Sequence, residues 1–297
     1  MSRRLVGSGD NLRTQPTHQP ASAPNETETK LKAMTDLPPV TLRPLPSETI
    51  SDIRGQLRGT VALVGGGPGD PGLISYRGYQ YVGAADVILI DHLAPNLSSI
   101  IPADCDVIDV AKLPYRKSVA QEKVNSMLVE HAEAGQFVVR LKGGDPFIFG
   151  RGLEEQEYCE DQNVPVTVVP GITSPIAVPE TAGVSVTQRG VTHDFTVVSG
   201  HVPPGHPKSL VNWDALGHMR GTICIIMGVK NGGAIAQALM DAGRDPETPA
   251  FVTQEGTTSN EKSIATTLSS LGQVLENVNP PAVIVIGDVA VPRPHAE

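Results

Sequence analysis

The stretch VVRLKGGDPFIFGRG, residues Val138–Gly152, predicts a buried strand that ends in a ligand-facing turn. Its apolar start is typical of a buried strand, and two adjacent glycines followed by Asp-Pro indicate a turn. In an open α/β sheet, ligands bind beyond the carboxyl ends of the strands. Gly143 and Gly144 would let a flat ligand lie against bare backbone, and Asp145 could accept hydrogen bonds from its amines or hydroxyls. An ordinary strand-to-helix loop is the alternative interpretation.

A second glycine-rich loop, GGGPGDPG at Gly65–Gly72, follows an earlier apolar run. Its spacing departs from the G-x-G-x-x-G pattern of dinucleotide-binding proteins. Pro68 and Asp70 stand where a phosphate needs free amide donors and no negative charge. The loop therefore argues against a nicotinamide cofactor, while it supports a second ligand-facing turn of the same kind.

Apolar runs alternate with helical patterns from Gly59 onward. Such alternation predicts an α/β fold with parallel or mixed sheets and helices on their faces. We expect strands in VALVGG, DVILID, CDVIDVAK, VVRLK and PVTVVPG, and then in FTVVSGH, GTICIIMGVKN, PAFVTQEGTT and PAVIVIGDV. Helices are expected between them, for example at 234–242 and 265–278. The two series predict two α/β/α domains, residues 57–190 and 191–297, with a cleft between them.

Residues 1–56 are rich in Pro, Ser, Thr and Asn and show no sustained periodicity, which predicts a disordered N-terminal tail. The whole chain has a net charge of −9, although its first 58 residues hold eight Lys/Arg and six Asp/Glu. The remainder is therefore the more acidic part, which argues against nucleic-acid binding. An anionic small substrate would need local clusters of cations.

The sequence contains no run of about 18 apolar residues, so no membrane span is predicted. The three cysteines, Cys105, Cys159 and Cys224, lie far apart and form no C-x-x-C pair. A reduced cytoplasmic location is the simplest expectation. His201 and His206 flank a Pro/Gly-rich loop with no acid or cysteine to complete a metal site, so we expect no metal.

Asp91 and Lys112 each follow a predicted strand. A carboxylate and an amine at neighbouring strand ends can serve as base and acid if burial tunes their pKa values. A helix-capping aspartate and a solvated lysine are the alternatives.

Six motifs in a fixed order resemble the tetrapyrrole (corrin/porphyrin) methylase family: VGGGPGDPG, DHL, VVRLKGGDPFIFGRG, VVPGITS, THDFTVVSGH and MGVKN. The resemblance runs from Gly59 to about Arg293. It implies two α/β domains, S-adenosylmethionine as the methyl donor, no metal and a homodimer. Within the family the motifs are most similar to those of enzymes that methylate C2 and C7 of uroporphyrinogen III to give precorrin-2, which leads to sirohaem and cobalamin.

The resemblance also implies roles for individual residues. Asp91 would accept a proton and Lys112 would donate one. The methyl donor would be bound by Pro68, Gly143, Gly144, Asp145, Ile148, Thr173, Ser174, Met227 and Gly256. Glycines and apolar side chains suit a purine and a sulfonium, and hydroxyls suit the polar ends of the donor.

The sequence departs from the family pattern on the expected substrate side. His92 stands where Arg is commoner, and LPYRK follows Lys112 in place of the usual Arg-Ala-Gly pattern. Arg116 and Lys117 are the cations retained there, and we expect them to meet substrate carboxylates. Two alternatives remain: a methyltransferase of a later corrin intermediate, or of RNA or a protein side chain, and a tetrapyrrole-binding protein without turnover.

Overall fold

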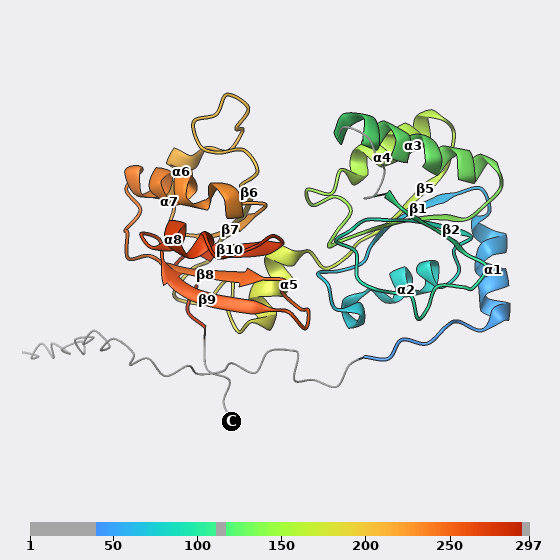
Figure 1. The fold of residues 1–297 in the computed structure, drawn as a ribbon, viewed down its shortest axis with the longest axis horizontal. Coiled ribbons are helices and arrows are strands. Elements are labelled where there is room, and N and C mark those ends of the chain that lie inside the picture. The colour runs from blue at the N-terminus through green and yellow to red at the C-terminus, as the bar shows by residue number, and fades with distance from the viewer. Residues whose placement is uncertain (1–39, 111–116, 293–297) are drawn as a thin grey trace, which may run out of the picture. The chain divides into compact units, whose positions relative to one another are not determined.

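The computed structural model describes residues 40–110 and 117–292, and the first half of this range contains a five-stranded parallel sheet (Figure 1). The strand order is β3-β2-β4-β1-β5, and each neighbouring pair runs parallel. The strands are β1 (Val61–Gly65), β2 (Val87–Ile90), β3 (Asp106–Asp109), β4 (Val138–Lys142) and β5 (Val166–Val169). All five coincide with predicted apolar runs, which confirms the α/β character of this part.

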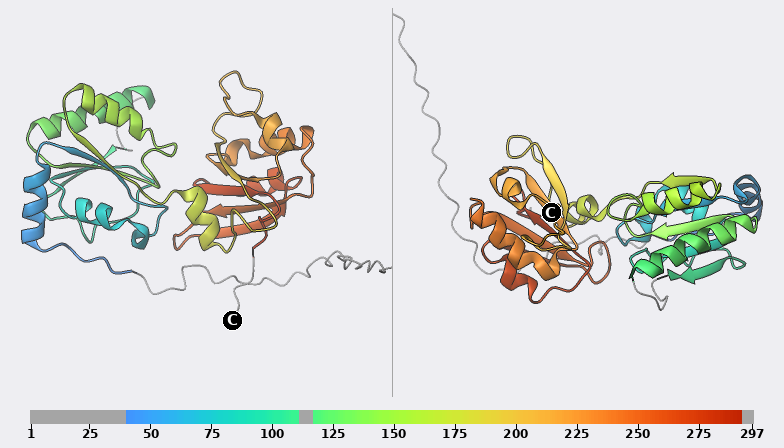
Figure 2. Two further views of the ribbon diagram at one scale, coloured as in Figure 1. Left: turned by 180° about the vertical axis from the view of Figure 1, so that it is seen from behind. Right: turned by 90° about the horizontal axis from the view of Figure 1, so that it is seen from above.

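Helices cover both faces of this sheet because the apolar side chains of its strands point alternately to either side. Val61 and Leu63 pack with α3 (Lys117–Glu133) and α4 (Gly152–Asp161), whereas Ala62 and Val64 pack with α2 (Tyr76–Val82). Figures 1 and 2 show α3 and α4 on one face and α2 on the other. A short 3₁₀ helix, η2 (Pro71–Leu73), precedes α2.

The helix α1 (Ser47–Leu57) corrects the prediction that residues 1–56 form a disordered tail. Ile53 and Leu57 pack against the α2 side of the first core. Arg54 forms ion pairs with Asp86 (Nε–Oδ1, 2.9 Å) and Asp104 (Nη1–Oδ2, 2.7 Å). The prediction failed at this point because the apolar residues of this segment are few and become meaningful only against the packed sheet. Residues 1–39 lie outside the described ranges.

A second five-stranded sheet, of mixed direction, has the order β6-β7-β10-β8-β9. Only β6 and β7 run parallel, while β10 pairs antiparallel with β7 and β8, and β9 antiparallel with β8. The strands are β6 (Phe195–Ser199), β7 (Thr222–Ile226), β8 (Pro249–Gln254), β9 (Lys262–Thr267) and β10 (Ala282–Ile286). The sequence predicted parallel or mixed sheets, and the second sheet is a mixed one.

One predicted helix, 265–278, is wrong over its first residues. Residues up to Thr267 belong to β9, and only α8 (Leu271–Leu275) is helical. The ladder of β9 with β8 extends from Lys262 to Thr267, so tertiary pairing outweighs a local pattern that also suits a helix. The prediction of a helix at 234–242 is confirmed by α7 (Gly232–Asp241).

The faces of the second sheet also carry separate apolar clusters. Ile223 and Ile225 pack with α6 (Trp213–His218), α7 and α8, whereas Cys224 packs with Val178 of α5 (Ser174–Thr181). A short 3₁₀ helix, η4 (Val229–Asn231), precedes α7. Val178 of α5 thus packs with the second sheet, although the boundary predicted after residue 190 would separate the two. None of the helices in the described ranges is long and apolar enough to cross a bilayer.

Removing residues 1–57 should destabilise the protein, whereas removing residues 1–39 should not. The longer deletion exposes core side chains that Ile53 and Leu57 cover and leaves Asp86 without Arg54. We expect Tm to fall by about 5 °C or more, because each kcal/mol of stability lost with the apolar burial lowers Tm by roughly 2–4 °C. Differential scanning fluorimetry of both truncations measures it, and equal Tm values for the two would show that α1 is dispensable.

Candidate active site

Four loops gather at the carboxyl edge of the first sheet, following β2, β4, β1 and β5 in spatial order. The connection that leaves β1 crosses to β2 on the α2 face, whereas the connection that leaves β4 crosses to β5 through α4 on the opposite face. Strands β4 and β1 are neighbours, so their loops diverge at a topological switch point. Ligands of open α/β sheets bind at such points.

The glycines of these loops bring three backbones into direct contact. Gly67 and Gly144 exchange two backbone hydrogen bonds, of 3.2 Å to the Gly144 oxygen and 2.7 Å to the Gly67 oxygen. A Cβ on Gly65 would lie 2.7 Å from the Gly144 oxygen, and a Cβ on Gly171 would overlap the same oxygen. The contact therefore requires glycine at both positions.

Gly143 and Gly144 differ in the space beside them. A Cβ on Gly143 would lie 2.6 Å from the Leu93 oxygen, whereas a Cβ on Gly144 would meet nothing closer than 3.8 Å, at Thr173. Gly144 also has a φ of +65°, a conformation that favours glycine. The open side of Gly144 thus offers bare backbone to a ligand, and it faces the start of α5.

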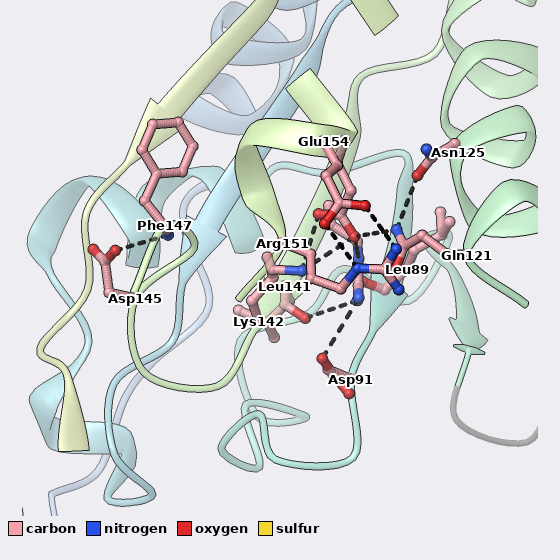
Figure 3. Close-up of polar contacts among 12 residues, drawn as sticks. Leu89, Asp91, Gln121, Asn125, Leu141, Lys142, Asp145, Phe147, Arg151 and Glu154 are labelled. Atoms are coloured by element: carbon pink, nitrogen blue, oxygen red, sulfur yellow. Dashed lines mark hydrogen bonds and ion pairs between the residues drawn. The ribbon is translucent and has the colours of Figure 1, made fainter. Parts of the chain in front are cut away.

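The Asp145 carboxylate is bound within its own loop. Oδ1 accepts a hydrogen bond from the amide of Phe147 (2.8 Å; Figure 3). Oδ1 also accepts from the Ile148 amide (3.1 Å), and Oδ2 accepts from the Gly171 amide (3.1 Å). The sequence predicted a contact from Asp145 to a ligand. In the structure this carboxylate ties the β4 loop to the loop after β5, so its first role is to shape the site.

The remaining residues expected at the methyl donor lie on several loops. Pro68 follows β1, and Thr173 and Ser174 begin α5, close to Gly144. Ile148 and Met227 are about half exposed. Gly256 follows β8, and a Cβ there would overlap Val178 of α5.

Three non-glycine residues that follow strands of the second sheet hold left-handed backbone conformations: Met227 (φ 54°), Glu255 (φ 48°) and Thr257 (φ 67°). Such conformations are uncommon for these residue types and concentrate at functional sites. Met227 follows β7 directly, and the other two flank Gly256. Backbone strain thus marks the same two strand ends that the resemblance assigns to the donor.

Asp91 follows β2, the strand beside β4. Its amide donates to the Leu141 oxygen (3.1 Å), which fixes it against the end of β4. Its Oδ1 accepts from the His92 amide (2.9 Å), and its Oδ2 lies 3.5 Å from Nη2 of Arg140. The side chain keeps 32% exposure, so a substrate can reach it. Lys112 and Arg116 lie outside the described residues, and Lys117 is described only as the first residue of α3.

The sequence analysis missed a buried ion network directly behind Asp91. Glu155 of α4 is fully buried, and it faces Arg140 (Nε–Oε1, 3.0 Å) and Lys142 (Nζ–Oε2, 3.0 Å) of β4. Gln121 of α3 donates to the same carboxylate (3.1 Å), and Figure 3 shows Gln121, Lys142 and Asp91 around these contacts. The motif VVRLK does indicate part of this network, because Arg140 and Lys142 stand two positions apart in a buried strand and therefore share one face of the sheet.

Burial lowers the pKa of the Lys142 amine, and the nearby Arg140 lowers it further, while Glu155 opposes both effects. Two buried cations therefore face a single buried carboxylate. Among the described residues no cluster of His, Cys, Asp and Glu has a geometry that could hold a metal ion.

Replacing Asp145 with Asn should loosen the loop without a change in size. The amide nitrogen would face the Gly171 amide, so one buried donor loses its acceptor. A loss of about 1–3 kcal/mol in the free energy of unfolding is expected. Urea unfolding measures it. Asn96→Asp, at an exposed turn, serves as a control. Unchanged stability of the Asp145 variant would show that the loop does not depend on this carboxylate.

Comparison with known proteins agrees with this arrangement. The family model for Tetrapyrrole (Corrin/Porphyrin) Methylases matches residues 60–272. The chain is 44% identical over 237 residues to a uroporphyrinogen-III C-methyltransferase of Methanocaldococcus jannaschii, covering 78% of this chain and 97% of that protein. It is 40% identical over 239 residues to a siroheme synthase of Actinobacillus succinogenes, covering 80% of this chain and 49% of that protein.

A solved structure has a similar fold. The uroporphyrin-III C-methyl transferase of Thermus thermophilus complexed with S-adenyl homocysteine matches with a TM-score of 0.66 and 35% sequence identity. The match covers 77% of this chain and 98% of that chain. The switch-point loops, the strained strand ends and these similarities lead to one conclusion: the chain belongs to the tetrapyrrole (corrin/porphyrin) methylase family.

Proposed function

We propose that the protein transfers methyl groups from S-adenosylmethionine to C2 and C7 of uroporphyrinogen III, giving precorrin-2 for sirohaem and cobalamin synthesis. The observation that carries the proposal is that Asp91 lies beside the loop of Gly143 and Gly144, which follows β4. The Asp91 amide donates to the oxygen of Leu141, two residues before Gly143. The Asp91 carboxylate and the exposed backbone at Gly144, which we call the cradle, therefore lie at adjacent strand ends. The relative from Methanocaldococcus jannaschii, 44% identical, carries the name of this activity.

The cradle fits the donor by its shape and composition. The open side of Gly144 admits a flat group against backbone, and the half-exposed side chains of Ile148 and Met227 supply apolar contact. Thr173 and Ser174, whose backbones lie next to Gly144, carry hydroxyls that suit the polar ends of the donor. We assign donor binding to these residues together with Pro68, Gly143, Asp145 and Gly256.

S-adenosylmethionine supplies an electrophilic methyl group when it is bound. The protein holds the acceptor carbon in line with that methyl, and this positioning provides much of the acceleration. A pyrrole ring that gains a methyl cation must lose a proton to become neutral again. Asp91, partly exposed and fixed by the end of β4, accepts that proton. Lys112 would protonate one ring atom only where a second proton leaves another, so that the net loss remains one proton.

The assembly proposed for the protein is a cytoplasmic homodimer that binds neither nucleic acid nor membrane. Exposed large apolar side chains support a self-association surface: Phe147, Phe149 and Leu153 are each about half exposed. The net charge of −9 supports the absence of a nucleic-acid partner.

Anaerobic assays with radiolabelled S-adenosylmethionine and uroporphyrinogen III test the function. The wild-type protein should form a dimethylated product, and Asp91→Asn should lower kcat by about 10²-fold or more. Binding of S-adenosylhomocysteine, measured by calorimetry, should stay unchanged in this variant. Label incorporated only into later corrin intermediates, or tetrapyrrole binding without any transfer, would overturn the proposal.

The Arg116→Ala, Lys117→Ala double variant should bind uroporphyrinogen more weakly. Each charge-assisted hydrogen bond to a carboxylate contributes about 1.5–3 kcal/mol, so KM should rise at least about tenfold. Affinity for S-adenosylhomocysteine should not change, since the donor cradle lies on other loops. Steady-state kinetics decide the matter, and an unchanged KM would assign the substrate carboxylates to other cations.

A further inference from the structure

The buried network behind Asp91 holds more positive than negative charge. The side chains of Arg140, Lys142 and Glu155 are at most 5% exposed. Glu155 can neutralise only one of the two cations. An unpaired buried charge is unfavourable, so a carboxylate next to the guanidinium of Arg140 stabilises the network. Asp91 is the carboxylate that faces Arg140, with its Oδ2 3.5 Å from Nη2.

The guanidinium of Arg140 has its orientation fixed by contacts that do not involve Asp91. Its Nε donates to Glu155 (3.0 Å), and its Nη1 donates to the backbone oxygens of Leu89 and Leu141 (both 3.4 Å). A planar fork held at two of its nitrogens cannot rotate freely. Nη2 therefore points toward Asp91 because the strands β2 and β4 and the helix α4 direct it there.

Glu155 is anchored in turn by two other elements. Its Oε1 accepts from Gln121 of α3 (3.1 Å), and Gln121 also donates to Asn125 (2.9 Å). Lys142 contacts both carboxylate oxygens, at 3.1 and 3.0 Å. The network thus connects the two helices of one sheet face to the strand end that carries Asp91.

We propose that Arg140, held by Glu155, is a positioning residue that orients the Asp91 carboxylate for proton transfer. The proposal rests on the function proposed above. His92 occupies the other oxygen, since its amide and Nδ1 lie 2.9 and 3.2 Å from Oδ1. With Oδ1 bound locally and Oδ2 facing Arg140, the carboxylate plane is fixed from both sides. Neither cation is exposed enough to bind substrate itself.

A double-mutant cycle between Arg140 and Asp91 separates positioning from a purely structural role. In the wild-type background, Arg140→Gln should lower the single-turnover rate of methyl transfer about tenfold or more, with KM for the donor changed less than about twofold. In the Asp91→Asn background the same substitution should change the residual rate by less than about twofold, because the group it orients is gone. Radiolabelled donor makes the residual rates measurable.

Equal rate factors in both backgrounds would overturn the positioning role, since Arg140 would then act through the fold or the substrate. Wild-type protein without methyl transfer would instead overturn the proposed function. Arg140→Lys keeps the charge but lacks the second nitrogen, so it should behave like Arg140→Gln. Full activity of Arg140→Lys would show that charge alone suffices and would also contradict the proposal.

Two further variants control for folding. Arg140→Gln combined with Glu155→Gln removes one charge of each sign, so the net buried charge stays as it was, and this pair should show the same loss of rate. Arg54→Gln removes an arginine that bridges Asp86 and Asp104, far in sequence from the site. It should lower Tm but leave kcat within about twofold when assayed below Tm. A loss of kcat in Arg54→Gln matching that of Arg140→Gln would mean that both act through stability.

Discussion

The close contact of three glycine backbones determines how the carboxyl edge of the first sheet is built. Gly65, Gly144 and Gly171 follow or end three adjacent strands, and side chains at Gly65 and Gly171 would collide with the Gly144 carbonyl. The contact brings the loop after β4 against the end of β1 and the loop after β5, and Asp145 ties it to the β5 loop. A loop contact formed from backbone in this way depends on main-chain geometry that few substitutions can preserve.

A buried ion network is weak evidence for stability, because the desolvation of its charges offsets their attraction. The network of Arg140, Lys142 and Glu155 is better explained by geometry. Apolar side chains of equal volume would fill the space between β4 and α4, but they would not aim a hydrogen-bond donor at Asp91. The same α4 that closes the core therefore also takes part in the chemistry.

The sequence predicted the strands of both sheets except β9, because the others are apolar runs bounded by turn residues. Strand β9 is exposed over most of its length, and its end was expected to be helical. It did not predict α1, whose helix depends on packing by Ile53 and on the ion pairs of Arg54. The loops proposed to bind the donor stand out by their motifs, but the contacts within them could not be predicted. Asp145 looks like a ligand contact in sequence, and its engagement by three backbone amides depends on where β5 places Gly171. An ion pair between residues 13 positions apart, such as Lys142 and Glu155, produces no local sequence pattern that would reveal it.

An acidic protein that binds a substrate with eight carboxylates cannot rely on its overall field, which opposes the approach. Short-range pairs must supply the affinity, and the structure limits which cations are free to form them. Arg140 and Lys142 are buried and engaged by Glu155. Arg151 is half exposed but bound at 3.0 and 2.6 Å to Glu154, so a substrate carboxylate would have to displace that partner. Substrate affinity should therefore depend on cations outside the β4 strand and its loop, because the cations of the strand face Glu155 and Asp91.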